Sequence, residues 1–287
     1  TKLLELIRQI VSRVNRTVNT ASPIVDARLE DGSRVHVVLE PVALNGPILT
    51  IRKFPDPITM DRLLEYGSVT REAADLLKTL AAARYNIFVS GGTGATFLNA
   101  LSEFIPPEER VITIEDSAEL KLAHIENLVR LETRNANGEG QGAIGIGMLI
   151  RAALRMRPDR IVIGEVRGQE AVDLLQAMNT GHDGSFCTGH ANSCRDMLAR
   201  LETMVLMGME LPLPAIRSQI ASALDVMVHV ARMRNRSRKV TAIEEVVGIE
   251  NGEIVLRPLF SLDGEGELRK AGDLRCQEKL RRAGYGL

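Results

Sequence analysis

The spacing of apolar residues predicts a helix followed by strands in the first part of the chain. Residues 1–19 carry apolar side chains at helical spacing, at Leu3, Leu4, Ile7, Ile10, Val11 and Val14. Three strand-like runs follow, at 23–29, 34–39 and 48–52. The step Asp31-Gly32 between the first two runs is a hairpin turn signal. We therefore predict a small α+β domain over residues 1–54.

Beyond a proline-rich stretch, the pattern changes to short apolar strands that alternate with helices. Pro55 and Pro57 disfavour helix in the residues before them, so residues 55–70 are expected to form a linker. Helices are predicted at 71–84, 147–156, 169–179 and from Thr96 onward, and strands at 85–90, 110–115, 160–164 and within 243–260. This alternation is typical of a parallel α/β sheet, and we assign it to a second domain over residues 71–287.

A glycine turn between a predicted strand and a predicted helix forms the first candidate site. Its residues are Gly91, Gly92, Thr93, Gly94, Ala95 and Thr96. Glycines let several backbone N–H groups point at one anion, and the following helix adds its positive N-terminal end. This context is the one that the phosphate-loop motif G-x-x-x-x-G-K-S/T requires. We predict that the turn binds nucleotide phosphates, the alternative being a turn without a ligand.

The phosphate-loop motif is incomplete in this chain. Counted from Gly91, its sixth and seventh positions should be Gly and Lys, but Thr96 and Phe97 stand there. Inserting Gly-Lys-Thr between Ala95 and Thr96 would give GGTGAGKTTFLNAL, so three missing residues explain the difference better than scattered substitutions. The lysine is a major positive group on the β- and γ-phosphates. Its absence predicts impaired nucleotide affinity and turnover.

Two predicted strands end in carboxylates. Glu165 follows the strand at 160–164, and Glu115 and Asp116 stand at the end of the strand at 110–115. Because the carboxyl ends of parallel strands form the ligand-binding edge of open α/β sheets, both sets should face the phosphate loop. There Glu165 could orient a water, and the carboxylates could converge on Mg²⁺ for metal-assisted hydrolysis. The alternative for each is a solvated side chain at a strand end.

Two histidines lie in a segment of small residues after the predicted helix at 169–179. His182 and His190 could donate hydrogen bonds to a γ-phosphate or contact the acidic strand ends, although an isolated histidine is usually structural. Together with Cys187 and Cys194 they could instead supply four zinc ligands, but their spacing is not that of a standard zinc finger. We favour the contact with phosphate.

Arginines complete the set of candidate residues. They are Arg28, Arg34 and Arg52 in the predicted first domain, and Arg130 and Arg134 beyond the acidic strand. Arginine can neutralise charge that develops on a transferred phosphoryl group, from the same chain or from a neighbouring subunit. For any single arginine, a solvated surface position is the commoner alternative.

Composition narrows the class of protein. The net charge is −1, aromatic residues make up 3% and there is no Trp, which speaks against a RecA-type nucleic-acid translocase and against a direct nucleic-acid partner. Three cysteines fit a reducing compartment better than a disulfide framework. No apolar run approaches the ~18 residues of a membrane helix. We expect a cytoplasmic protein that docks peripherally at the inner membrane through a partner.

Several motifs together resemble one family. They are GGTG followed by TFLNAL, then ITIEDSAEL, VRLETR, ALRMRPDRIVIGEVRG, AMNTGHDGS and TGHANS. This order resembles the type II/IV secretion ATPase superfamily, and it is most similar to the Tad/Flp pilus-assembly branch (CpaF-type). The resemblance implies an α/β fold with a RecA-like P-loop NTPase core and a PAS-like N-terminal domain. It also implies a homo-hexamer that uses ATP and Mg²⁺ to drive pilin extrusion or protein secretion through an inner-membrane platform protein.

The resemblance assigns roles to the candidate residues. The catalytic group comprises the Asp box, the Walker B glutamate and the His box, here Glu115, Asp116, Glu165, His182 and His190. The nucleotide-binding group comprises the Walker A region and arginines that reach the nucleotide between domains or subunits, here Gly91, Gly92, Thr93, Gly94, Ala95, Thr96, Arg28, Arg34, Arg52, Arg130 and Arg134. Glu115 and Thr96 are the implied Mg²⁺ ligands.

The chain departs from the family pattern in two respects. The Walker A lysine and its neighbours are absent, so a catalytically impaired ring subunit, a pseudo-ATPase, is the main alternative to a working motor. The paired-cysteine zinc module of type II secretion and type IV pilus extension motors is also absent. Its absence favours the Tad or type IV secretion side of the superfamily.

Overall fold

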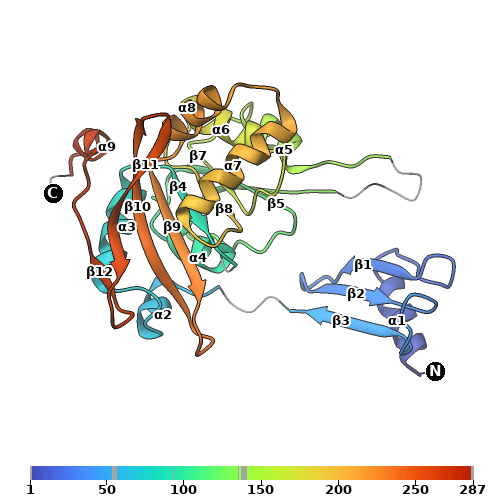
Figure 1. The fold of residues 1–287 in the computed structure, drawn as a ribbon. Coiled ribbons are helices and arrows are strands. Elements are labelled where there is room, and N and C mark those ends of the chain that lie inside the picture. The colour runs from blue at the N-terminus through green and yellow to red at the C-terminus, as the bar shows by residue number, and fades with distance from the viewer. Residues whose placement is uncertain (1, 54–56, 93, 135, 137–140, 286–287) are drawn as a thin grey trace. The chain divides into compact units, whose positions relative to one another are not determined.

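The chain folds into two compact units, residues 1–56 and 57–287 (Figure 1). The computed structural model describes residues 2–53, 57–92, 94–134, 136 and 141–285. Thr93, in the predicted phosphate loop, therefore lies outside the described residues. None of the described helices is long and apolar enough to cross a membrane.

The first unit is a helix packed on a three-stranded antiparallel sheet. Helix α1 (Lys2–Ser12) precedes strands β1 (Ile24–Arg28), β2 (Arg34–Val38) and β3 (Ile48–Arg52), in the sheet order β1-β2-β3. Ile7 and Val11 on α1 and Val35 and Val37 on β2 form its buried core. The alternation of β2 leaves Arg34 and His36 exposed on the other face of the sheet. The predicted α+β elements are confirmed.

The second unit is built on one large mixed sheet. Its strands are β4 (Ile87–Ser90), β5 (Arg110–Glu115), β6 (Asn127–Glu132), β7 (Arg160–Ile163), β8 (Phe186–Gly189), β9 (Val226–Arg232), β10 (Arg238–Glu250), β11 (Glu253–Leu262) and β12 (Leu268–Lys270). The sheet order is β12-β11-β10-β9-β4-β8-β7-β5-β6. The strands from β9 to β6 in this order run parallel, and β10 to β12 add antiparallel hairpins.

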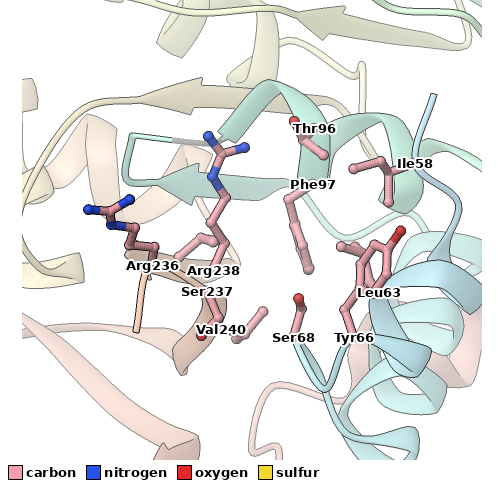
Figure 2. Close-up of a pocket in the computed structure, with 11 residues that line it drawn as sticks. Ile58, Leu63, Tyr66, Ser68, Thr96, Phe97, Arg236, Ser237, Arg238 and Val240 are labelled. Carbon is pink, nitrogen blue, oxygen red and sulfur yellow. The ribbon is translucent and has the colours of Figure 1, made fainter. Parts of the chain in front are cut away.

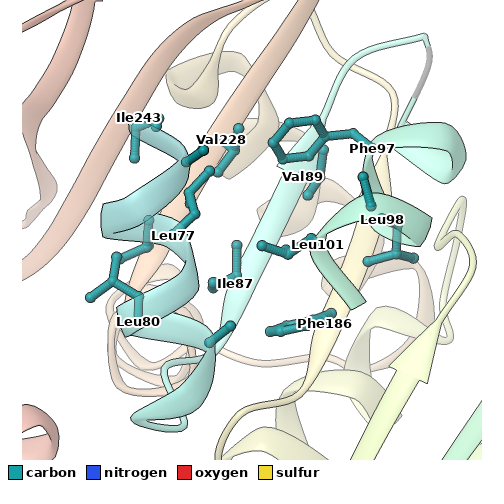
Figure 3. Packing of buried hydrophobic residues seen from close by; sticks show 14 of the residues in the cluster. Leu77, Leu80, Ile87, Val89, Phe97, Leu98, Leu101, Phe186, Val228 and Ile243 are labelled. Atoms are coloured by element: carbon teal, nitrogen blue, oxygen red, sulfur yellow. The ribbon is translucent and has the colours of Figure 1, made fainter. Parts of the chain in front are cut away.

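Helices cover both faces of the large sheet. They are α2 (Met60–Glu65), α3 (Arg71–Ala82), α4 (Gly94–Ser102), α5 (Ile146–Ala153), α6 (Ala171–Asn179), α7 (Cys194–Gly208), α8 (Leu213–Ala223) and α9 (Glu278–Arg282). Side chains of α2, α3 and α4 share one core, and those of α5 to α8 share the other. Figure 3 shows Leu77 of α3 and Leu101 of α4 packed over Ile87 and Val89 of β4. Burial on both faces explains why β4 is apolar throughout.

Part of the segment that we expected to be a linker belongs to the second unit. Thr59 caps helix α2, accepting the Arg62 N–H at 3.2 Å, and Met60 and Leu63 are buried in the core. Of the two prolines that suggested a linker, Pro55 lies outside the described residues. Met60, Leu63 and Leu64 instead lie on a short helix.

Candidate active site

The carboxyl ends of four neighbouring parallel strands meet at one edge of the large sheet. Gly91 follows β4, His190 follows β8, Glu165 lies two residues beyond β7 and Glu115 ends β5. These strands are adjacent, in the order β4-β8-β7-β5. The edge therefore gathers the glycine turn, the acidic strand ends and one of the two histidines.

The glycine turn is tight and depends on Gly91. This residue has φ +117°, and a Cβ atom on it would lie 2.0 Å from the carbonyl oxygen of Val230 on β9. Its N–H donates to the carbonyl of Gly189 at 3.0 Å, which ties the turn to β8. Helix α4 begins at Gly94, two residues before the predicted start at Thr96, and the Gly94 N–H donates to the Gly91 carbonyl at 3.3 Å. The turn thus closes sharply without the three missing residues.

Glu115 is buried and half-satisfied. Its Oε2 accepts the N–H groups of Glu119 and Leu120 at 2.7 and 2.9 Å, while Oε1 has no hydrogen-bond partner among the described residues. Desolvation raises the pKa of this carboxyl from 4.5 to about 7, against the lowering effect of the two N–H groups and of Arg130. Glu115 can therefore exchange a proton near neutral pH, and one of its carboxylate oxygens is buried without a partner in the described part of the chain.

Glu165 is the centre of a polar network at the same edge. Its Oε1 lies 3.0 Å from His190 Nε2, and its Oε2 accepts from Arg167 at 2.8 Å. Arg167 also lies 3.7 Å from Asp116, and the hydrogen bond to Glu165 raises the pKa of its guanidinium. The Thr188 hydroxyl donates to the Gly164 carbonyl, which holds the segment before Glu165 against β8. Glu165 thus contacts one histidine and one arginine at this edge.

His182 lies at the opposite edge of the sheet. Its Nδ1 is 3.2 Å from the Ala177 carbonyl, and its own carbonyl accepts from the Ser185 hydroxyl, just before β8 begins. Asn86, which precedes β4, bonds the backbone of the same segment. Strand β8 separates the two histidines, so the predicted grouping of His182 with His190 at one site is not found.

The alternative zinc site is wrong. Cys187 and Cys194 are buried in the core on the α5–α8 side, whereas His190 is exposed at the carboxyl edge. Within the described part of the chain, no three His, Cys, Asp or Glu side chains form a group that could hold a metal. The four residues are close in sequence, but strand β8 and the start of α7 spread them apart.

The predicted arginines fall into two sets. Arg130 on β6 donates to the Leu120 carbonyl at 3.1 Å and so supports the loop that covers Glu115, and Arg134 donates to the Gly142 carbonyl at 2.7 Å. In the first unit, Arg28, Arg34 and Arg52 occupy one register position across β1, β2 and β3. The three thus stand side by side in that sheet.

A buried polar cluster beneath the turn was not predicted. The Ser90 hydroxyl lies 2.7 Å from Nδ1 of His229 on β9, and both residues are buried. Burial lowers the pKa of His229 and raises that of the Cys194 thiol, which contacts Ser90 and Glu244. A single histidine in the apolar run of β9 was the sequence signal for this cluster.

A cavity of about 410 Å³ lies beside the turn. It is lined by Ile58, Leu63, Tyr66, Ser68, Thr96, Phe97, Val230, Arg236, Ser237, Arg238 and Val240. Figure 2 shows the side chains of Arg236 and Arg238, from the β9–β10 hairpin, at the same cavity as Thr96 and Phe97 of α4. The sequence signal was the basic run from Arg232 to Lys239, which we did not connect to the phosphate loop.

Comparison with known proteins supports one family by sequence. Residues 1–258 match the family described as Type II/IV secretion system protein. A putative conjugal transfer protein of Mycobacterium tuberculosis (strain H37Rv) is 42% identical over 249 residues, which cover 83% of this chain and 70% of that protein. The type IV secretion system protein PtlH of Bordetella pertussis is 35% identical over 246 residues, 76% of this chain and 73% of that protein.

The fold is also similar to that of a solved structure. The crystal structure of the VirB11 ATPase from the Brucella suis type IV secretion system, in complex with sulphate, matches with a TM-score of 0.54 and 30% identity. The match covers 85% of this chain and 82% of that chain. The predicted fold class, an α/β RecA-like core with a small α+β domain, is confirmed.

Proposed function

The chain belongs to the type II/IV secretion system protein family, and on this premise we propose that it is an ATPase that drives secretion or pilus assembly. The observation that carries the proposal is the shared sheet edge, where the glycine turn, Glu115 and the Glu165–His190 pair come together. Nucleotide hydrolysis needs a phosphate loop beside acidic side chains. The loop holds the charged phosphates, and the acidic side chains hold the metal ion and orient the attacking water next to them.

In this proposal Glu165 orients the attacking water. Its carboxylate is 18% exposed and is held between His190 and Arg167, so it is accessible but fixed. His190 is 53% exposed and contacts Glu165 through Nε2, so it can exchange this contact for one with a γ-phosphate oxygen. Loss of the phosphate would return His190 to Glu165, which would report the state of the nucleotide.

In this proposal Glu115, Asp116 and Thr96 would hold a magnesium ion together with the phosphates. Glu115 Oε1 is a buried acceptor without a partner among the described residues, and carboxylate oxygens are the ligands that Mg²⁺ prefers. Asp116 on the same strand end and the hydroxyl of Thr96, on the first turn of α4, would complete the protein's share of the ligands. When bound, the ion would neutralise charge on the phosphate oxygens.

The assembly and its task are further parts of the proposal. We infer a homo-hexamer in which Arg28, Arg34, Arg52, Arg130 and Arg134 approach the nucleotide from between units or subunits. The ring would dock on the cytoplasmic side of an inner-membrane platform protein. The motifs resemble the Tad/Flp branch, whereas the similar proteins are described as conjugal transfer and type IV secretion proteins, so pilin or secreted protein is the proposed cargo.

One observation favours a second candidate, a ring subunit that binds nucleotide without turning it over. Strand β4 ends at Ser90 and α4 begins at Gly94, so the connection between them forms without the missing glycine, lysine and threonine. The lysine charge on the phosphates is then absent. Inserting Gly-Lys-Thr between Ala95 and Thr96 distinguishes the two candidates. If the chain is an impaired subunit, it hydrolyses no ATP as it stands and gains ATP turnover only with the insertion.

The test measures phosphate release and ATP affinity of the full chain, with its oligomeric state, for the wild type and Glu165→Gln. Glutamine cannot accept a proton, so turnover should fall at least about a hundredfold while the Kd for ATP changes less than about threefold. Glu170→Gln is the matched control, because Glu170 bonds the backbone of the same loop. Undiminished turnover in Glu165→Gln would refute the role of Glu165.

A further inference from the structure

We propose that Arg236 and Arg238 form a cationic clamp for the phosphates of the nucleotide, in place of the absent lysine, while the apolar wall of the same cavity receives the base. The inference rests on the proposed function, because it concerns how this chain would bind a nucleoside di- or triphosphate. It goes further by assigning the positive charge to the β9–β10 hairpin, which no phosphate-loop motif contains.

The position of the cavity is the first argument. Val230 lines it, and the carbonyl of Val230 is the group that approaches Gly91 so closely that only glycine fits there. Thr96 and Phe97, on the first turn of α4, form another part of the wall. The cavity therefore begins where the phosphate turn ends, and a ligand with phosphates at the turn would extend into it.

The charge of the cavity is the second argument. Its lining contains two arginines and no acidic residue. Among the described residues, neither guanidinium group has a recorded ion pair or hydrogen bond, whereas the adjacent Lys239 pairs with Glu267 at 3.5 Å. Two like charges at one cavity repel each other, and an anionic ligand would relieve this repulsion.

The hairpin presents the two arginines in a defined way. The Met233 N–H donates to the Ser237 carbonyl at 2.8 Å, and the Asn235 side chain accepts from the Ser237 hydroxyl at 2.6 Å, so the turn is braced internally. Arg236 takes φ +68° within this turn. Beyond it, Arg238 and Val240 line the cavity while Lys239 does not, as strand alternation requires.

The chemistry of the lining selects the ligand class. A guanidinium presents a planar fork of donors that can bind phosphate oxygens bidentately, so two arginines can replace the charge of one lysine. Tyr66, Phe97, Ile58 and Leu63 offer apolar and aromatic surface for a ring. A small inorganic anion would leave this surface unused, whereas a nucleotide would use both parts.

The test compares binding of ATP and of adenosine to the full chain by equilibrium dialysis. The double variant R236A/R238A should lose ATP affinity about tenfold or more, because charge-assisted hydrogen bonds are lost, while adenosine affinity changes less than about threefold. R234A is the matched control, since Arg234 is exposed on the same hairpin but does not line the cavity. R236K/R238K should recover part of the affinity, and circular dichroism checks that each variant is folded.

A second arm separates a clamp that replaces lysine from a general basic surface. In a chain with Gly-Lys-Thr inserted between Ala95 and Thr96, R236A/R238A should cost less ATP affinity than in the chain without the insertion, because the lysine then supplies the charge. An equal cost in both backgrounds would overturn the replacement. If the wild type binds ATP and R236A/R238A binds it equally well, the clamp fails and the proposed function stands. If the wild type binds no ATP, both fail.

Discussion

The two edges of the large sheet differ in how fully their polar groups are satisfied. At the amino edge, Arg160 is fully buried and donates to Glu109, to the Ala81 carbonyl and to the Gly184 carbonyl. Glu245, also buried, accepts the N–H groups of Arg275 and Cys276. Arg160 and Glu245 each have several partners within the protein, which is what burial of charge requires, whereas Nε of the half-buried Arg257 has none among the described residues.

The carboxyl edge is built from the same strands but leaves groups open. Glu115 keeps one buried oxygen without a partner in the described part of the chain, and Arg236 and Arg238 lie at a cavity without acidic neighbours. Glu165 contacts two exposed side chains, His190 and Arg167. A buried acceptor that has no partner among the described residues, such as Oε1 of Glu115, costs stability unless a ligand satisfies it.

The difference indicates which edge of the sheet stabilises the fold and which edge is available to bind a ligand. At the amino edge the buried charges of Arg160 and Glu245 are hydrogen-bonded within the protein, so they stabilise the sheet without a ligand. The other edge is incomplete in the free chain, and a nucleotide with its cation would complete it. If this division is correct, substitutions at the amino edge should mainly change the free energy of unfolding, and substitutions at the carboxyl edge should mainly change binding or its pH dependence.

The largest effect is expected from removing the buried cation at the amino edge. Arg160→Met would leave the Glu109 carboxylate and two backbone carbonyls without their main donor, so the free energy of unfolding should fall by about 3–5 kcal/mol. Urea denaturation followed by circular dichroism measures the change. Arg84→Met is the control, because Arg84 contacts the same Glu109 but is 41% exposed, and it should cost about 1 kcal/mol or less.

Two equal losses for Arg160→Met and Arg84→Met would break the comparison, since they would mean that burial at this edge adds nothing. The double variant Arg160→Met/Glu109→Gln sharpens it further. It removes the unpaired buried charge that Arg160→Met leaves behind, so part of the lost stability should return. No recovery would show that the packing of the arginine, including its 6.0 Å contact with the Phe186 ring, dominates over its charge.

Contiguous patterns made much of the fold predictable from the sequence. The strand at 110–115 was predicted with its observed bounds, because a β-branched run from Val111 to Ile114 ends in two carboxylates. The strands predicted within 243–260 are found as parts of β10 and β11, which meet at a turn where Asn251 and Gly252 take positive φ. The acidic strand ends could be predicted to face the glycine turn, since parallel strands share one carboxyl edge.

Tertiary contacts account for what could not be predicted. Strand β8 has only the four residues Phe-Cys-Thr-Gly, without polar–apolar alternation, so the sequence did not reveal it. His182 and His190 therefore appeared to share one loop, although they lie at opposite ends of β8. The clamp arginines belong to a basic run whose link to the phosphate turn depends on β9 pairing with β4. Arg160 looked like an ordinary strand start, and nothing local indicated that Glu109 would bury it.

A smaller effect, dependent on pH, is expected at the carboxyl edge. Because burial raises the pKa of Glu115 from 4.5 to about 7, its stabilising protonated form is fully present below pH 4.5 and is lost as pH rises to 7. The free energy of unfolding of the wild type should therefore fall by up to about 3 kcal/mol over this range relative to Glu115→Gln, which has no proton to lose. Urea denaturation at pH 5 and pH 8 gives the difference.

Asp116→Asn is the control for this pH effect, because Asp116 is the adjacent carboxylate but is 47% exposed. Parallel stability curves for the wild type and Glu115→Gln would show that the open oxygen of Glu115 costs nothing, and the contrast between the edges would be lost. A cation at the site would favour the charged carboxylate, so added Mg²⁺ with nucleotide should narrow the difference at pH 8.

The smallest effect is expected for the ion pair that faces solvent at the carboxyl edge. His190→Gln removes the contact with Glu165 where the ring is 53% exposed, so the free energy of unfolding should change by less than about 1 kcal/mol. The matched substitution at the amino edge is Lys279→Met, which leaves the largely buried Asp225 without its 2.6 Å partner and should cost about 1–3 kcal/mol. Urea denaturation of both variants tests the ranking. If His190→Gln were the costlier, the Glu165–His190 pair would be a structural brace, and its proposed exchange with a phosphate would lose its physical basis.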